Sequence, residues 1–239
     1  MIREGIAWFV VSILGGITAS LSGFGIGSLM TPALATRYSV ADAILAVSIP
    51  HAIATAVRCW RLRRSIDWTV LRGFGIASAV GGIVGALLFL RSEAELETIL
   101  GVLLIATGLG GVTGWNRRIH PGRLGSAMLG GASGFFGGMA GNQGGLRAAA
   151  LTIWHLSPAA FVATSTAVGL MVDAARLPIY LAGAGTDLGS LAFPIAIGTA
   201  GVLIGTLAGE RILMRLSAER FRQIVSALII VLGVWLLAR

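Results

Sequence analysis

Two glycine clusters interrupt the longest apolar segments of the chain, at positions where a bound anion would be favoured. Residues 23–27 have the sequence GFGIG, and residues 141–145 have the sequence GNQGG. Glycine weakens a helix and permits tight bends, so each cluster is expected to break its segment. A helix that restarts after such a break presents free N–H groups and the positive end of its dipole, and both favour an anion.

Polar side chains strengthen this interpretation at the second cluster. Asn142 and Gln143 supply side-chain donors, and Arg147, one turn further on, supplies a full positive charge. The predicted substrate-binding residues are Gly25, Gly27, Ser28, Asn142, Gln143, Gly144, Gly145 and Arg147. There are two alternatives: glycines that only permit close helix packing, and an Arg147 side chain that snorkels to the membrane interface.

Three further ionisable residues in apolar segments are candidates for coupling transport to protons. His51 follows Pro50, and histidine is the side chain that ordinarily changes charge near neutral pH. Asp173 and Arg176 lie one helical turn apart, so mutual neutralisation is the alternative to a coupling role. Arg58 is expected to be a charge at the cytoplasmic end of its segment, and His51 could equally be a hydrogen-bonded packing residue.

Enzymatic chemistry has little support in the sequence. Residues 131–134 (GASG) resemble the serine motif of rhomboid intramembrane proteases, with Ser133 as the nucleophile. Such a serine needs a histidine within hydrogen-bond reach, and His51 and His155 are the candidates within or near the membrane. The sequence has no metalloprotease helix, phosphate loop or metal-ligand spacing, and its single cysteine excludes an intrachain disulfide. We therefore expect no enzyme, cofactor or metal site.

Composition places these residues in a membrane. Of the 239 residues, 56% are hydrophobic and only 12% are charged, about half the charged fraction of a soluble domain. The net charge is +8, and all 18 basic residues are arginine. These arginines cluster in short loops between apolar runs, which favours a positive-inside membrane protein over nucleic-acid binding.

Eight hydrophobic segments carry the chain through the bilayer in this interpretation. They are approximately residues 5–36, 40–60, 70–90, 95–114, 124–154, 158–182, 188–209 and 218–238. The first and fifth are each about 30 residues long. A continuous helix of that length would extend roughly 45 Å, well beyond the hydrocarbon core.

The two halves of the chain match each other at an offset of 118 residues. The offset aligns Gly16 with Gly134 (134 − 16 = 118), and it aligns Arg58 with Arg176. The predicted units are a first membrane repeat at residues 1–118 and a second at 119–239, as is typical of secondary transporters. The spacings Gly81–Gly85 and Gly201–Gly205–Gly209 fit a small-xxx-small pattern, expected to serve contacts within one chain, with a homodimer as the alternative.

The number of membrane crossings between the arginine-rich loops predicts how the broken segments are placed in the membrane. Arginine-rich loops fall at residues 58–72, 117–123 and 211–222, and the positive-inside rule places all three in the cytoplasm. Three segments lie between the last two loops. Because both loops lie in the cytoplasm, the number of crossings between them must be even, so one of the three segments does not cross. The fold class is therefore an all-α membrane protein with inverted four-segment repeats, each opening with a glycine-broken re-entrant hairpin. Arg37 then lies outside, which counts mildly against this, and the alternative is a full crossing by each broken segment.

The paired glycine clusters resemble the sulfite exporter TauE/SafE-like family, also called the toluene-sulfonate uptake permease family. In that family each half begins with a glycine-rich stretch of the form G-x-G-G-G. Residues 163–167 (ATSTA) match the small-residue helix that follows. Ile26 and Gln143 each stand where the family has glycine, and Leu146 stands where it has proline. The resemblance implies two four-segment repeats and transport of sulfite, sulfonates or other sulfur-containing or organic anions.

Together these observations predict a secondary transporter that moves a small anion across the bacterial cytoplasmic (inner) membrane by alternating access. The expected partners are the anion, the lipid bilayer and a coupling proton, and no nucleic acid. An anion channel is the main alternative, and an intramembrane serine protease is a remote one. Substrate, direction of transport and oligomeric state stay open at this point.

Overall fold

A computed structural model describes residues 2–89, 94–113, 122–140, 144–183 and 189–238, and every regular element among them is a helix. This confirms the predicted all-α class. The helices are α1 (Ile2–Ser22), α2 (Ile26–Ala35), α3 (Val40–Leu62), α4 (Trp68–Val70), α5 (Ile76–Phe89), α6 (Ala94–Thr113), α7 (Arg123–Ala140), α8 (Gly144–Leu151), α9 (Pro158–Gly183), α10 (Ala192–Leu213) and α11 (Ala218–Leu237). A π-helical turn, Leu71–Gly75, joins α4 to α5.

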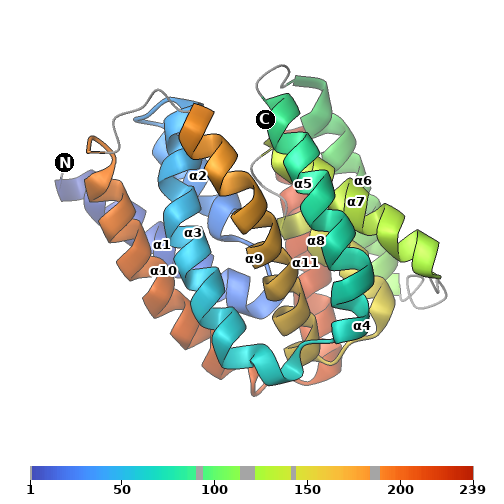
Figure 1. Cartoon of the computed structure of the whole chain (residues 1–239). Coiled ribbons are helices and arrows are strands. Elements are labelled where there is room, and N and C mark those ends of the chain that lie inside the picture. The colour runs from blue at the N-terminus through green and yellow to red at the C-terminus, as the bar shows by residue number, and fades with distance from the viewer. Residues whose placement is uncertain (1, 90–93, 114–121, 141–143, 184–188, 239) are drawn as a thin grey trace.

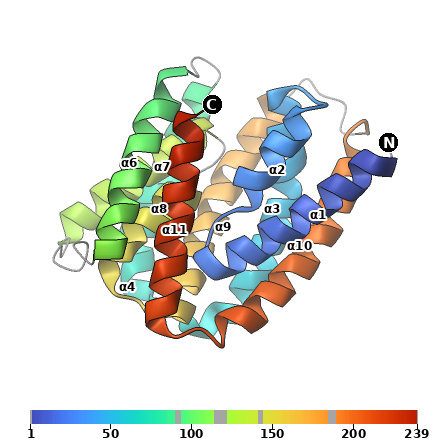
Figure 2. The same cartoon turned by 180° about the vertical axis from the view of Figure 1, so that it is seen from behind.

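Each of the two long predicted segments consists of two helices separated at its glycine cluster. The first is divided into α1 and α2, with Gly23 at φ 78° and Gly25 at φ 134°. Side chains rarely adopt these backbone conformations, so glycine is required where the chain turns. α2 packs against α1 and runs back toward the end of the molecule that holds the N-terminus (Figure 2). The second segment is divided into α7 and α8, which also pack on each other.

The two halves of the chain use the same packing scheme. α1 packs on α10, and its counterpart α7 packs on α5. α3 packs on α10, and its counterpart α9 packs on α5, while α3 and α9 pack on each other in the interior (Figure 1). α6 and α11 form the remaining large pair. Equivalent helices therefore have equivalent neighbours, and the pairs α1–α10, α5–α7, α3–α9 and α6–α11 each join the first half of the chain to the second.

Glycines bring the backbones of these crossing helices together. An added Cβ on Gly201 would lie 2.9 Å from the Phe9 carbonyl oxygen of α1, and one on Gly209 would lie 2.8 Å from the Ile17 oxygen. In the other half, a Cβ on Gly81 would overlap the backbone of Gly131 in α7. The predicted small-xxx-small positions therefore mediate contacts within one chain, as expected from their spacing.

Replacement of Gly134 by alanine is expected to lower the free energy of unfolding by about 1–3 kcal/mol, the usual cost of overpacking. The added Cβ would overlap the Ser78 backbone, lying 2.6 Å from its carbonyl carbon and 2.8 Å from its Cα. Gly131→Ala, one turn earlier on α7, is the matched control, because its Cβ would meet nothing closer than 3.9 Å. Thermal unfolding of the purified variants measures the difference. Equal stability of the two would contradict the packing described above.

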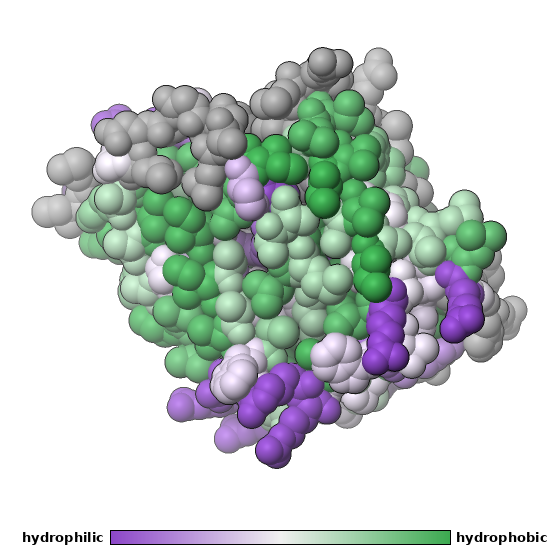
Figure 3. Space-filling model, viewed as in Figure 1, coloured by the Kyte–Doolittle hydropathy of each residue, from purple (hydrophilic) through white to green (hydrophobic). Residues whose placement is uncertain are grey.

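The outer surface is apolar and ends in a charged edge. Five helices in the described part of the chain are long and apolar enough to cross a membrane, namely Arg3–Ser22, Asp42–Ser65, Trp68–Leu88, Pro158–Ile179 and Ala192–Leu213. Large apolar side chains such as Ile76, Val80 and Leu87 are exposed on α5. Hydrophilic residues gather at the lower edge in Figure 3, where α3 ends and the exposed Arg63 and Arg64 follow it. Such a surface suits lipid around the helices and water at the edge.

Candidate functional site

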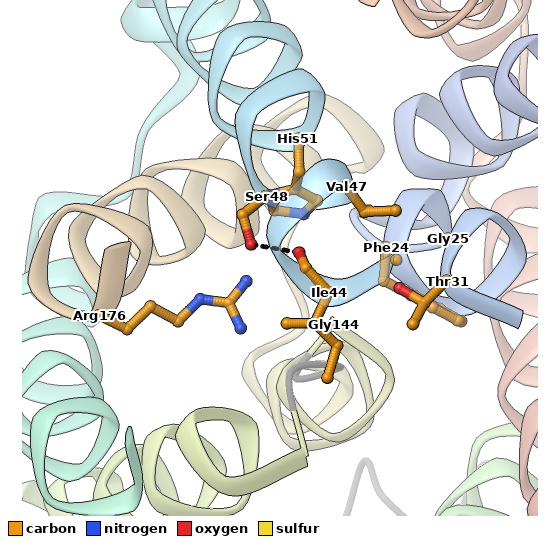
Figure 4. A pocket seen from close by; sticks show the side chains of 10 residues that line it. Phe24, Gly25, Thr31, Ile44, Val47, Ser48, His51, Gly144 and Arg176 are labelled. Atoms are coloured by element: carbon orange, nitrogen blue, oxygen red, sulfur yellow. Dashed lines mark hydrogen bonds between the residues drawn. The ribbon is translucent and has the colours of Figure 1, made fainter. Parts of the chain in front are cut away.

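A pocket lies where the two glycine breaks meet, and we call it the central pocket. It is lined by Phe24, Gly25, Gly27, Thr31, Ile44, Val47, Ser48, His51, Gly144 and Arg176, which come from α2, α3, α8, α9 and the first break (Figure 4). The cavity is small, with a volume of about 20 Å³, and it is partly open to the outside. In this conformation it has room for about one water-sized group.

Two helix N-termini contribute to the wall of this pocket. Gly25 is the N-cap of α2 and has no side chain to cap the helix, while Gly144 is the first residue of α8. The first N–H groups of a helix have no partner within the helix and carry the positive end of its dipole. Two such ends facing one small pocket favour a negatively charged occupant.

A buried ionic network forms the opposite wall. The His51 Nδ1–H donates to the Asp173 Oδ2 at 2.6 Å, and the Arg176 Nε donates to the Asp173 Oδ1 at 3.1 Å. The Arg176 Nη2 lies 2.9 Å from the same oxygen in an ion pair. Arg176 also donates to the Gly137 carbonyl oxygen at 3.5 Å, which ties α9 to α7. The Arg176 guanidinium points into the pocket toward Gly144 and Ile44 (Figure 4). Asp173 thus joins the two ionisable side chains, His51 and Arg176, among the described residues that line the pocket.

The charges buried around this pocket do not balance. Among the described residues, three arginines are nearly inaccessible, with Arg58 and Arg147 each 2% exposed and Arg176 4% exposed. Asp173, at 3% exposed, is the one carboxylate buried with them in that part of the chain. With His51 neutral, the buried charge is +3 − 1 = +2. Charges inside a membrane protein are costly unless paired, so this excess favours an anion.

The structure brings several predicted site residues together and separates others. Gly25, Gly27 and Gly144 line the central pocket, whereas Ser28 does not. Gly145 packs instead toward Leu232 and Leu104, in α11 and α6. Asn142 and Gln143 lie outside the described residues. The three coupling candidates, His51, Asp173 and Arg176, form one network.

Arg147 points into the protein rather than toward a membrane interface. Its Nη2 donates to the Gly23 carbonyl oxygen at 3.1 Å, and its Nε donates to the Ser165 Oγ at 3.1 Å. It therefore links α8 to the first glycine break and to α9. Arg147 is absent from the lining of the central pocket, and its predicted role as a direct substrate ligand stays a prediction.

Arg58 differs from the expectation drawn from its sequence. It was predicted to be a charge near the cytoplasmic surface, but it is buried and its Nε donates to the Thr166 Oγ1 at 2.9 Å. The physical reason is that α3 continues beyond it to Leu62, so its side chain reaches α9 instead of water. Its alignment with Arg176 in the repeat was the signal that could have revealed this.

Sequence analysis also missed the hydroxyl groups that accompany the charged residues. Ser48 and Thr31 line the central pocket, and the Ser48 hydroxyl donates to the Ile44 carbonyl oxygen at 2.7 Å (Figure 4). Ser165 and Thr166 accept hydrogen bonds from Arg147 and Arg58. Ser48 lies three residues before His51, one turn away on the same face of α3, which is the pattern that could have identified it.

The hydroxyl proposed for the protease alternative has no catalytic partner in the described part of the chain. The Ser133 Oγ is buried in α7 and has no hydrogen bond within the described residues. His51 is bonded to Asp173 instead, and His155 is exposed beyond the end of α8. A serine nucleophile requires a base within hydrogen-bond reach, and the described residues supply none.

Comparison with known proteins gives one match. A family model described as "Sulfite exporter TauE/SafE" matches residues 8–236, which is nearly the whole chain. No curated protein and no solved structure matches the chain.

Proposed function

The chain belongs to the sulfite exporter TauE/SafE family of membrane transport proteins, and from that premise we propose that it is a secondary transporter that carries a small anion through the central pocket. As a member of this family with several apolar helices, it is a multi-pass membrane protein and not an enzyme. The substrate we propose is sulfite, a sulfonate or another small sulfur-containing or organic anion.

The observation that carries this proposal is the excess of buried positive charge. Arg176 faces the pocket directly, and Arg58 and Arg147 lie buried nearby on α3 and α8. Their desolvation costs several kcal/mol per ion, and Asp173 compensates only one of the three. A bound anion would compensate the charge of a second arginine. It would also accept hydrogen bonds from the open N-terminus of α2.

The packing of the two halves supports alternating access. We propose two inverted four-segment repeats in which α1–α2 and α7–α8 are re-entrant hairpins that enter from opposite faces. The equivalent neighbours of equivalent helices support this, because the group α1, α2, α3 and α10 could then rock against the group α5, α7, α8 and α9 around the α3–α9 contact. Phe24 and Gly144 touch where the two breaks meet, so a pocket there is reachable from either hairpin.

The His51–Asp173–Arg176 network supports coupling to protons. A proton added to His51 would place a positive charge beside Asp173, and by competing for that carboxylate it would weaken the hold of Asp173 on Arg176, which faces the substrate. Since the three arginine-rich loops set the orientation, we propose that the protein resides in a bacterial cytoplasmic membrane with these loops inside.

Saturable counterflow distinguishes this carrier from an anion channel. Purified protein in liposomes loaded with unlabelled sulfite should accumulate ³⁵S-sulfite transiently, and the initial rate should saturate with external sulfite. Empty liposomes, and liposomes with the protein but without internal sulfite, are the controls. A conductance that rises linearly over a wide range of anion concentration, with no counterflow, would favour the channel and overturn the carrier.

A further inference from the structure

Two buried arginines outside the central pocket have donors that nothing in the described chain uses. Arg58 comes from α3 and Arg147 from α8, and each is 2% exposed. Each is held by its Nε atom, Arg58 on the Thr166 hydroxyl and Arg147 on the Ser165 hydroxyl. The Nη1 of both arginines is fully buried and has no hydrogen-bond partner among the described residues. Buried charged donors are almost always paired, so these two require an explanation.

The two guanidinium groups are anchored on neighbouring residues of α9. Ser165 and Thr166 are consecutive residues, and one anchors each arginine. Each arginine therefore carries a buried positive charge beside the same part of α9. Asp173, the buried carboxylate of the described chain, bonds His51 and Arg176. Two like charges held together inside a membrane protein are a costly arrangement without a counter-ion.

We propose that Arg58 and Arg147 form a second anion site, distinct from the central pocket and used by the same substrate. A small oxyanion there would accept hydrogen bonds from both free Nη1 groups and would separate two like charges. Arg58 lies seven residues after His51 on α3, so this site is roughly 10 Å from the central pocket along the helix axis. It lies toward the end of α3 that continues into the exposed Arg63 and Arg64.

The repeat gives this second site a place in transport. Arg58 aligns with Arg176, so each half of the chain contributes one arginine to the α3–α9 contact. The central pocket is open in this structure, while the Nη1 groups of the second site are buried. The anion therefore has two binding sites along α3, and the second is nearer the charged edge. This inference rests on the proposed function, since it assumes that the anion in question is transported.

Counting the bound anions tests the proposal. Isothermal titration of purified full-length protein with sulfite, in a buffer free of other small oxyanions, should give two sulfites per chain. Arg58→Gln should bind one, and Arg176→Gln should also bind one, because each removes a different site. Thr166→Val removes only the anchor and should weaken the second event about tenfold, the loss expected for a charge-assisted hydrogen bond. Arg72→Gln, an exposed arginine on the same charged edge, should still bind two.

The outcomes separate this inference from the proposed function. One sulfite per chain in the wild type, unchanged in Arg58→Gln and lost in Arg176→Gln, would overturn the second site and leave the central pocket standing. No bound sulfite in the wild type would contradict the proposed function itself. A circular dichroism spectrum like that of the wild type and a single symmetric gel-filtration peak for each variant exclude misfolding as the cause of a lost sulfite-binding event.

Discussion

Replacement of Arg176 by glutamine is expected to reduce sulfite counterflow at least ~100-fold. The substitution removes the only guanidinium among the described residues that line the central pocket, and it removes the ion pair with Asp173. Breaking one partner of a buried ion pair costs about 3–5 kcal/mol, and each 1.4 kcal/mol is a factor of ten. Part of that cost falls on folding, so initial rates must be normalised to correctly folded protein in the liposomes.

Two further variants make the Arg176 prediction specific. Asp173→Asn combined with Arg176→Gln leaves no unpaired buried charge in the network and is expected to recover stability without recovering transport. Arg61→Gln is the charge-matched control. Its side chain is 48% exposed and pairs with Glu210 at the surface, so its loss should leave counterflow unchanged. Counterflow within threefold of the wild type in Arg176→Gln would show that Arg176 does not hold the anion.

Replacement of Gly144 by alanine is expected to lower counterflow at least ~10-fold while the protein still folds. Gly144 begins α8 and touches the first glycine break, where an added Cβ would overlap the Phe24 side chain and lie 3.1 Å from the Phe24 Cα. Overpacking of this kind costs about 1–3 kcal/mol, and here it pushes apart the two breaks that form the pocket. The effect should fall on the transport rate more than on the helical content.

Gly122→Ala is the matched control for this prediction. Gly122 is exposed, lies just before α7, and its added Cβ would meet nothing within 4 Å. Both variants are compared with the wild type by counterflow and by circular dichroism. Normal transport in Gly144→Ala would mean that the contact between the breaks is not part of the transport site.

Helix boundaries were largely predictable because the local signals are strong. The predicted segment at residues 158–182 corresponds to α9, Pro158–Gly183, which starts at a proline and ends at a glycine. The breaks after Ser22 and Ala140 were predictable for the same reason, since clustered glycines cannot sustain a helix. These features depend on neighbouring residues, so the sequence alone contains them.

Contacts between distant residues were not predictable in the same way. His51 and Asp173 are 122 residues apart, and their bond depends on how α3 packs on α9. The direction of the Arg147 side chain is another example. A long flexible cation at that depth can reach either the interface or the interior, and only the position of the Gly23 carbonyl oxygen decides between them. The alignment of Arg58 with Arg176 was a signal of burial, but it did not identify Thr166 as the partner.

The central claim is that buried positive charge at the α3–α9 contact binds a small anion. Thermal unfolding of the purified protein, titrated separately with the sodium salts of sulfite, thiosulfate, methanesulfonate and acetate, tests it most directly, with sodium gluconate at equal ionic strength as the reference. A ligand at 100 times its Kd stabilises the folded state by about 2.7 kcal/mol. We predict such a rise in Tm with at least one of the sulfur anions in the wild type, and a clearly smaller rise in Arg176→Gln, which keeps only the second site. The same rise in both proteins, or no rise with any anion, would contradict the claim.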